Sequence, residues 1–224
     1  MNELAIYDMD RTVTRTGTYT PFLIHAAKTL APWRLVLAAA VPFTMAAYGL
    51  KLIDRRRLKE LNQRLLLGGA VPRAKLRPAV ESFADFICKT DIHPGARRQI
   101  AEDKAAGRRL VLATASYRFY VEAIAARLGF DDVIATGSIT GLDDIIHAKI
   151  DGENNYGPAK LRLVQAWMKE HGIAREGVRI RFYSDHVSDW PVLEWADTAI
   201  AVNPSSGLKR MAAERGWEIV DWGF

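Results

Sequence analysis

The chain has 224 residues and a formal net charge of +5 at pH 7, with 49% hydrophobic and 25% charged residues. These proportions are ordinary for a globular protein, and the length allows one moderate α/β domain plus a small accessory unit. The single cysteine, Cys88, excludes an internal disulfide and fits a reducing compartment, where we expect it as a buried structural thiol.

The first predicted strand ends at a pair of carboxylates. An apolar run at residues 4–7 stops at Asp8 and Asp10, and Thr12 follows. Side chains two apart in a strand point the same way, so both acids can share one site at its carboxyl end, where open α/β sheets bind ligands. Such a pair suits a hard metal ion, a nucleophile with a partner acid, or both. On this segment alone, turn-forming aspartates at a strand end are an equal alternative.

Residues 15–91 show several helical patterns and no convincing strand, which predicts an all-helical insert. Within it, residues 35–50 are apolar and uncharged, Trp33 precedes them, and a basic run at 55–59 follows. The apolar stretch is shorter than the roughly 20 residues that cross a bilayer, and Pro42 would kink or divide a helix. Three interpretations stay open: a buried cap helix or helical pair, an interfacial element that docks on an anionic membrane, and a spanning helix.

From residue 92 onward, predicted strands and helices alternate. The strands are expected at 109–114, 132–136, 178–184, 198–202 and 217–221, and residues 138–152 form an irregular or hairpin piece. Alternation of this kind predicts a mostly parallel sheet that is covered by helices on both faces.

Two segments of this alternating region offer groups for binding an anion. The strand at 109–114 leads into Thr114, Ala115 and Ser116 before a predicted helix, and a hydroxyl with backbone N–H groups there makes a phosphate cradle or an N-cap. Lys160 lies in the first turn of a later helix, where its charge opposes the helix dipole unless the side chain turns to an anion.

A second acid pair follows the strand at 178–184. Asp185 and Asp189 can approach one point above the sheet if a helix begins near Ser188. The neighbouring His186 is either a solvent-facing loop residue or a contact of the same site.

In this order the motifs resemble the haloacid dehalogenase (HAD) superfamily of phosphohydrolases, in subfamily IB and its phosphoserine phosphatase-like branch. The matched positions lie in residues 3–14 and 92–224, and Ser184 replaces a usual glycine; they are Asp8, Asp10, Thr12, Thr114 (with Ser116 as the other register), Lys160, Asp185 and Asp189. The resemblance implies a Rossmann-like, doubly wound α/β core at 1–14 and 92–224. It also implies an all-helical cap at 15–91, inserted after the first strand.

The resemblance further implies Mg²⁺-dependent hydrolysis of a phosphomonoester through an aspartyl-phosphate. Asp8 would be the nucleophile and Asp10 the general acid and base. Mg²⁺ would be held by Asp8, Asp185 and the backbone carbonyl of Asp10. The phosphate would be bound by Thr114, Ala115 and Lys160, and Asp189 and Thr12 would support the site.

The substrate and partners are less determined. The apolar, basic cap favours a lipid phosphate, similar to phosphatidylglycerophosphate or a lysophosphatidate, with peripheral contact to an anionic membrane. A soluble metabolite such as phosphoserine is the alternative, and a non-catalytic membrane- or partner-binding module is a third possibility that the presence of both Asp8 and Asp10 opposes. No motif accompanies the charge to indicate a nucleic-acid partner. No cleavable signal is predicted, which places the chain in the cytoplasm, either free or at the inner face of the membrane.

Overall fold

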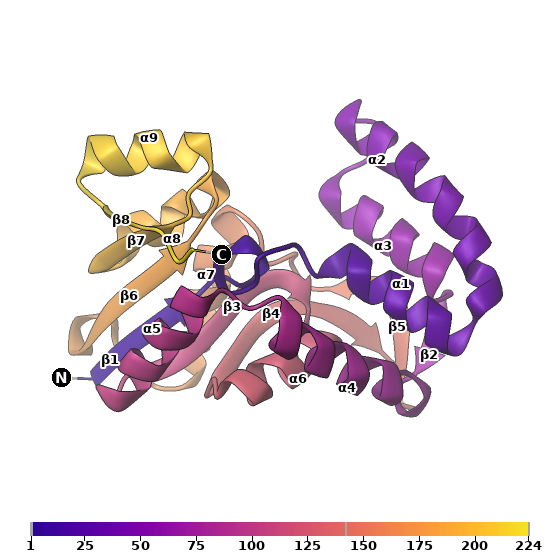
Figure 1. Ribbon diagram of the computed structural model, residues 1–224, viewed down its shortest axis with the longest axis horizontal. Coiled ribbons are helices and arrows are strands. Elements are labelled where there is room, and N and C mark those ends of the chain that lie inside the picture. Colours follow the sequence, from indigo (N-terminus) through magenta and orange to yellow (C-terminus); the bar gives the residue numbers. More distant parts are fainter. Residues whose placement is uncertain (1, 142, 224) are drawn as a thin grey trace.

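The computed structural model describes residues 2–141 and 143–223. Within them one sheet has the strand order β2-β5-β4-β3-β1-β6-β7-β8 (Figure 1). The strands are β1 (Asn2–Tyr7), β2 (Ala70–Pro72), β3 (Arg109–Tyr117), β4 (Asp132–Thr140), β5 (Ile145–Asp151), β6 (Val178–Ser184), β7 (Thr198–Val202) and β8 (Glu218–Val220). The ladder from β4 to β8 is parallel, and β5 returns antiparallel to β4, so the predicted mostly parallel sheet and its hairpin are confirmed.

The two faces of the sheet carry two separate hydrophobic clusters. Along β1 the side chains alternate, so Ala5 and Tyr7 join one cluster, whereas Leu4 and Ile6 join the other. The first cluster is covered by α4 (Arg73–Thr90), α5 (Pro94–Ala105) and α6 (Arg118–Leu128). The second is covered by α7 (Pro158–Glu170), α8 (Trp190–Trp195) and α9 (Ser206–Arg215). Helices therefore cover both faces, as the alternation predicts.

The insert after β1 is mainly helical. It contains α1 (Tyr19–Leu30), a 3₁₀ segment η2 (Pro32–Ala40), α2 (Val41–Gly49) and α3 (Arg55–Leu66). Figure 1 shows α2 away from the sheet, on the side opposite α9, whereas α3 contacts β5 through hydrogen bonds such as that from Arg56 to the Ile150 carbonyl. The prediction of an insert without strands is wrong, because β2 pairs antiparallel with β5 at the sheet edge. A strand of three residues is too short to show a period of two in the sequence.

The two chain crossings between core and insert lie side by side. Thr14 forms an isolated antiparallel bridge with Ile92, and the Arg15 N–H donates to the Asp91 carbonyl at 2.7 Å. This pairing supports the proposed division into a core at 1–14 and 92–224 and a cap at 15–91. Residues 1, 142 and 224 of that division lie outside the described residues.

The apolar stretch at 35–50 does not form a buried helix. Pro42 stands in the first turn of α2, where a proline is tolerated, and the stretch divides into η2 and α2. Neither element contains a buried residue, so the interpretation as buried cap core is wrong. No helix in the described part of the chain has the length and hydropathy that crossing a bilayer requires.

Candidate active site

Seven of the predicted site residues line one cavity of about 490 Å³. The cavity lies where β1, β3 and β6, three neighbours in the sheet, reach their carboxyl ends. Its predicted members are Asp8, Asp10, Thr114, Ala115, Lys160, Asp185 and Asp189. Thr12 lies directly behind the cavity and contacts two of these carboxylates.

Lys160 joins two carboxylates at the base of the cavity. Its Nζ lies 2.6 Å from Asp8 Oδ1 and 2.7 Å from Asp189 Oδ2, and all three side chains are buried. Burial lowers the pKa of Lys160, but the charges of Asp189 and Asp8 outweigh burial and hold this pKa above its usual range. The lysine in the first turn of α7 thus contacts two carboxylates, and these contacts offset its unfavourable interaction with the helix dipole.

Burial makes negative charge on Asp8 and Asp185 costly. The Thr12 hydroxyl lies 3.1 Å from Asp185 Oδ1 and 3.4 Å from Asp8 Oδ2, and it accepts the Asp185 N–H at 3.0 Å. Burial raises the pKa of Asp8 to about 8, although Lys160 opposes the rise. Burial also raises the pKa of Asp185, against the hydrogen bond from Thr12. A bound cation would relieve both carboxylates.

No group of three or more His, Cys, Asp and Glu side chains in the described ranges 2–141 and 143–223 is arranged to hold a metal ion. A site of two carboxylates and a backbone carbonyl needs no third such side chain, because Mg²⁺ keeps several of its waters. The buried oxygen donors at Asp8 and Asp185 therefore fit Mg²⁺ in type and charge.

Asp10 is held apart from this cluster by hydroxyl groups. Its Oδ1 accepts hydrogen bonds from the N–H and the hydroxyl of Thr18, both at 2.7 Å, and its Oδ2 accepts one from the Ser116 hydroxyl at 2.7 Å. Tyr120 completes the group, because its hydroxyl lies 3.0 Å from Thr18 Oγ1. A carboxyl fixed in this way in the same cavity as a second carboxylate is suited to moving a proton.

The two hydroxyl residues after β3 have different surroundings. Thr114 lines the cavity and its Oγ1 accepts the Ser116 N–H at 3.1 Å, whereas Ser116 binds Asp10. This placement supports Thr114 as the phosphate-binding register. The role of Ser116 and Thr18 was missed by the sequence analysis, since nothing near Thr18 marks it as a partner of Asp10.

Ser184 fits where the family motif usually has glycine. It is buried at the end of β6, and its hydroxyl donates to Asp189 Oδ2 at 2.8 Å. The added side chain thereby orients the carboxylate that holds Lys160. The neighbouring His186 is exposed, lines the cavity and accepts the Ser188 N–H through Nδ1 at 3.1 Å.

The cap supplies walls that the sequence did not reveal. Tyr19 and Arg55 line the cavity, and the Arg55 guanidinium lies 3.9 Å from the ring centroid of Tyr156, which lines it from the core. Arg56 instead donates to the carbonyls of Ile150 and Gly152 at 2.6 and 2.9 Å. The basic run at 55–59 is therefore divided between the wall of the cavity and contacts to the core.

A buried lysine joins the cap to the core beside the cavity. Lys59 Nζ donates to the Ala115 carbonyl at 2.6 Å and to Asn154 Oδ1 at 2.9 Å, and it lies 4.3 Å from the ring centroid of Tyr117. Burial and the Arg55 charge lower the pKa of Lys59 to about 7, although Asp10 opposes this. Lys59 thus ties α3 to the segment that carries Thr114.

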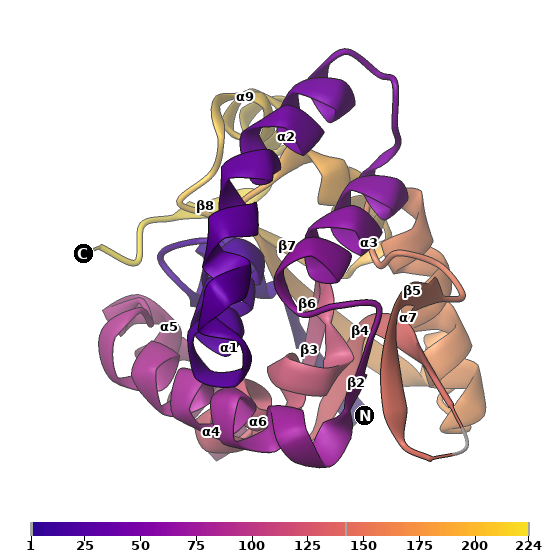
Figure 2. The same ribbon diagram turned by 90° about the vertical axis from the view of Figure 1, so that its right-hand side faces the viewer.

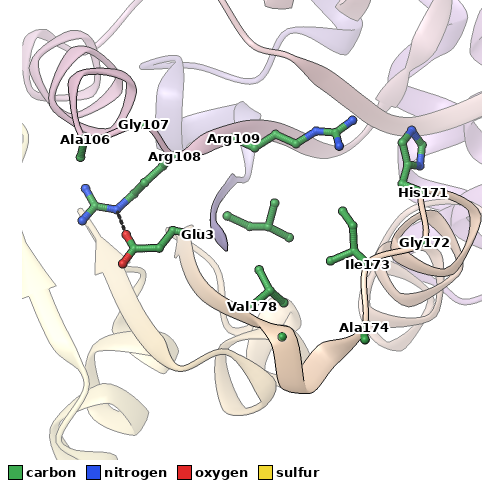
Figure 3. Close-up of a pocket in the computed structure, with 12 residues that line it drawn as sticks. Glu3, Ala106, Gly107, Arg108, Arg109, His171, Gly172, Ile173, Ala174 and Val178 are labelled. Carbon is green, nitrogen blue, oxygen red and sulfur yellow. Dashed lines mark hydrogen bonds and ion pairs between the residues drawn. The ribbon is translucent and has the colours of Figure 1, made fainter. Parts of the chain in front are cut away.

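A larger cavity, of about 850 Å³, lies at the opposite end of the strands (Figure 3). Its charged lining groups are already paired: Glu3 with Arg108 at 2.6 Å, and Arg109 with Asp132 at 2.6 Å. Ligands of open α/β sheets bind at the carboxyl ends of the strands. The smaller cavity at the carboxyl edge is therefore the candidate active site.

Several known proteins are similar to this chain. A profile of the haloacid dehalogenase-like hydrolase family matches residues 5–194. The "Inhibition of morphological differentiation protein" of Streptomyces azureus is 31% identical over 220 residues, which cover 97% of this chain and 78% of that protein. Phosphoserine phosphatase SerB1 of Mycobacterium tuberculosis is 32% identical over 149 residues, or 66% of this chain and 47% of that protein. The aligned region thus spans about half the length of this mycobacterial relative.

Solved structures extend the likeness to the whole fold. A protein of unknown function from Bordetella pertussis Tohama I superposes with a TM-score of 0.90 at 26% identity, and the match covers 100% of both chains. A phospho-aspartyl intermediate analogue of a phosphoserine phosphatase superposes with a TM-score of 0.63 at 19% identity, covering 99% of this chain and 94% of the other. At that identity the second comparison shows a shared fold.

Proposed function

This chain belongs to the haloacid dehalogenase-like hydrolase family, and we propose that it dephosphorylates small polar phosphomonoesters through an aspartyl-phosphate on Asp8. As a phosphatase of this family it is a phosphoric monoester hydrolase. The observation that carries the assignment of residues is the buried chain Asp8–Lys160–Asp189, which lies beside Asp185 in one cavity.

The proposed reaction has two displacements at phosphorus. The Asp8 carboxylate attacks the phosphorus, the bond to the leaving oxygen breaks, and Asp10 gives that oxygen its proton. Asp10 then takes a proton from the water that hydrolyses the acyl phosphate, which regenerates Asp8 and releases phosphate. Thr114, the Ala115 backbone N–H and Lys160 would hold the phosphoryl oxygens, and Asp189 and Ser184 keep Lys160 oriented.

Mg²⁺ is the proposed cofactor. Asp8, Asp185 and the Asp10 backbone carbonyl would hold it, with Thr12 orienting the first two carboxylates. When bound, the ion supplies positive charge that lets an anionic nucleophile approach an anionic phosphate. We expect chelation to abolish turnover, Mg²⁺ to restore it and Ca²⁺ to inhibit it. Asp185→Ala should raise the Mg²⁺ concentration needed for half-maximal turnover about tenfold or more.

The lining of the cavity supports a small metabolite. Its cap-side members are Gly17, Tyr19, Thr20 and Arg55, and no residue from the apolar stretch at 35–50 lines it. A lipid phosphate would be favoured if this stretch shaped the pocket. Because the stretch does not line the cavity, that argument for a lipid substrate no longer holds. Any contact of the cap with an anionic membrane would then dock the enzyme and would not select its substrate. Arg55 offers a cation for a carboxylate on the part of the substrate that is not transferred.

A phosphate-release screen tests this preference. The purified enzyme would be given phosphoserine, other small phosphomonoesters and a lysophosphatidate, with and without detergent. We expect the small carboxylate-bearing substrates to be hydrolysed with the highest kcat/KM. Arg55→Gln should raise KM for these substrates more than for an aryl phosphate without a carboxylate, whereas the exposed Arg57→Gln should change neither. A lysophosphatidate with the highest kcat/KM would refute the preference for metabolites.

A further inference from the structure

Large apolar side chains are exposed mainly in one part of the cap. Six of the ten exposed large hydrophobic side chains in the described residues lie between positions 33 and 52: Trp33, Val36, Phe43, Met45, Leu50 and Leu52. Trp33 is 64% exposed and Phe43 is 77% exposed. They belong to η2, α2 and the turn that follows, which we call the cap arm (residues 32–53). Figures 1 and 2 both show α2 at the extremity of the cap, away from the sheet.

The cap arm is fixed to the rest of the cap. Leu35, Ala38 and Val41 pack against the first hydrophobic cluster. The Thr44 hydroxyl donates to Asn62 Oδ1 of α3 at 2.7 Å, and Arg34 donates to two carbonyls at the end of α3. One side of the arm therefore packs against the rest of the cap, which holds the arm in place. The apolar side chains on its other side remain exposed. Exposed apolar surface of this kind indicates an interaction site.

The charge around the cap arm selects the kind of partner. The sequence contains no Asp or Glu from Arg11 to Ile53, whereas Lys28 and Lys51 are both exposed. A complementary partner is therefore apolar and negatively charged. A second copy of the same surface would bring like charges together. An anionic bilayer offers hydrocarbon below a layer of phosphate, which matches an arm that exposes Trp33 in η2 and Phe43 in α2.

We propose that the cap arm docks on the surface of an anionic phospholipid bilayer. Trp33, Val36 and Phe43 enter the boundary between headgroups and acyl chains, and Lys28 and Lys51 lie among the headgroup phosphates. The arm lies on the membrane, because no helix within the described residues is long and apolar enough to cross it. The catalytic groups belong to other elements, so docking localises the enzyme and is independent of its chemistry.

Co-sedimentation with vesicles tests the proposal. The full chain would be mixed with vesicles of phosphatidylcholine containing about a third phosphatidylglycerol, or of phosphatidylcholine alone, at about 50 and about 500 mM salt. We expect binding to the anionic vesicles at low salt and at least about tenfold weaker partitioning at high salt, because screening shortens the reach of the lysine charges. Trp33→Ser combined with Phe43→Ser should weaken partitioning about tenfold or more.

A matched control comes from α4. Phe86 is 56% exposed and lies outside the cap arm, so Phe86→Ser should bind vesicles as the wild type does. Every variant should hydrolyse an aryl phosphate at the wild-type rate, which reports an intact fold. The proposal is overturned if the wild type does not bind anionic vesicles at low salt. It is equally overturned if the Trp33→Ser/Phe43→Ser variant binds them as well as Phe86→Ser does. It is also overturned if ultracentrifugation without lipid shows a dimer that the double variant dissolves, because the arm would then pair with a second copy.

Discussion

The carboxyl edge of the sheet buries charged side chains, whereas the cap arm exposes large apolar ones. At the edge, the charged side chain of Lys160 is 2% exposed and held between two carboxylates. On the arm, Phe43 is 77% exposed. Charged groups are normally outside and large apolar groups inside, so both regions bear a cost that folding alone does not explain. The catalytic site and the docking surface that we propose both lie where burial and hydropathy disagree.

The two regions should also respond differently to substitution. The buried charges at the edge depend on one another, and removing one leaves its partner without compensation. The outer side chains of the arm have little native packing to lose. We therefore expect large effects on turnover and stability at the edge, and effects on the arm that only a binding partner reveals.

The largest expected effect is at the nucleophile. Asp8→Asn should keep the fold and lose about three decades of turnover or more, because an amide cannot form the acyl phosphate. Phosphate release from a small aryl phosphate measures the loss. Beryllofluoride should label the wild type at Asp8. Asp85→Asn, an exposed carboxyl on α4, is the matched control and should be fully active. Near-normal turnover of Asp8→Asn would mean that the edge is not the catalytic centre.

The next largest effect tests the mutual dependence at the edge. Lys160→Met should lower the free energy of unfolding by about 3 kcal/mol, because Asp8 and Asp189 would face each other without the cation. Denaturant unfolding measures this, and added Mg²⁺ should recover part of the loss by replacing the missing charge. Lys169→Met on the exposed side of the same helix should leave stability within about 0.5 kcal/mol of the wild type. Equal stability of the two variants would contradict a coupled charge cluster.

Lys59 lies between the two regions and predicts a pH dependence. Its pKa is lowered to about 7 in the folded protein, while an unfolded lysine keeps a pKa of about 10.4. Between these values the unfolded state binds more protons, so the stability contribution of Lys59 rises with pH across this window and is constant below it. Relative to Lys59→Met, the wild type should gain on the order of 3 kcal/mol from pH 7 to 10.

Urea unfolding of both proteins at several pH values measures this difference. The comparison of Lys169→Met with the wild type at the same pH values serves as the control, because this lysine is exposed. A constant difference between the wild type and Lys59→Met would show that the folded state keeps Lys59 protonated through its carbonyl contacts.

The smallest expected effect is on the arm. Val36→Ser removes an outer side chain that is 78% exposed, so the free energy of unfolding should change by less than about 0.5 kcal/mol. Leu23→Ser in α1, which is fully buried, should cost about 3 kcal/mol or more and serves as the cap's positive control. Thermal unfolding of the two variants compares them directly. A large loss in Val36→Ser would mean that the arm packs against the protein rather than awaiting a partner.

The sequence by itself determined the core sheet and its charged site. The acids at 8, 10, 185 and 189 follow predicted strands, and parallel neighbours bring their carboxyl ends to one edge, so local patterns were enough to place them together. Thr114 followed from the same rule, whereas the role of Lys160, which lies in the first turn of a helix, followed from the family resemblance. The order of the motifs along the chain then fixed the family.

Only the tertiary structure decided how the cap meets this edge. Ser116 binds Asp10 across 106 positions, and Lys59 reaches the Ala115 carbonyl across 56. Arg55 reads in the sequence as one more basic residue, and folding makes it a wall of the cavity. From its sequence, the apolar stretch at 35–50 is compatible with a buried, spanning or surface element. Its hydropathy indicates a preference for an apolar environment, but not whether other parts of the protein cover it. Its exposure depends on the area that the rest of the cap offers, and that area covers only one side of the arm.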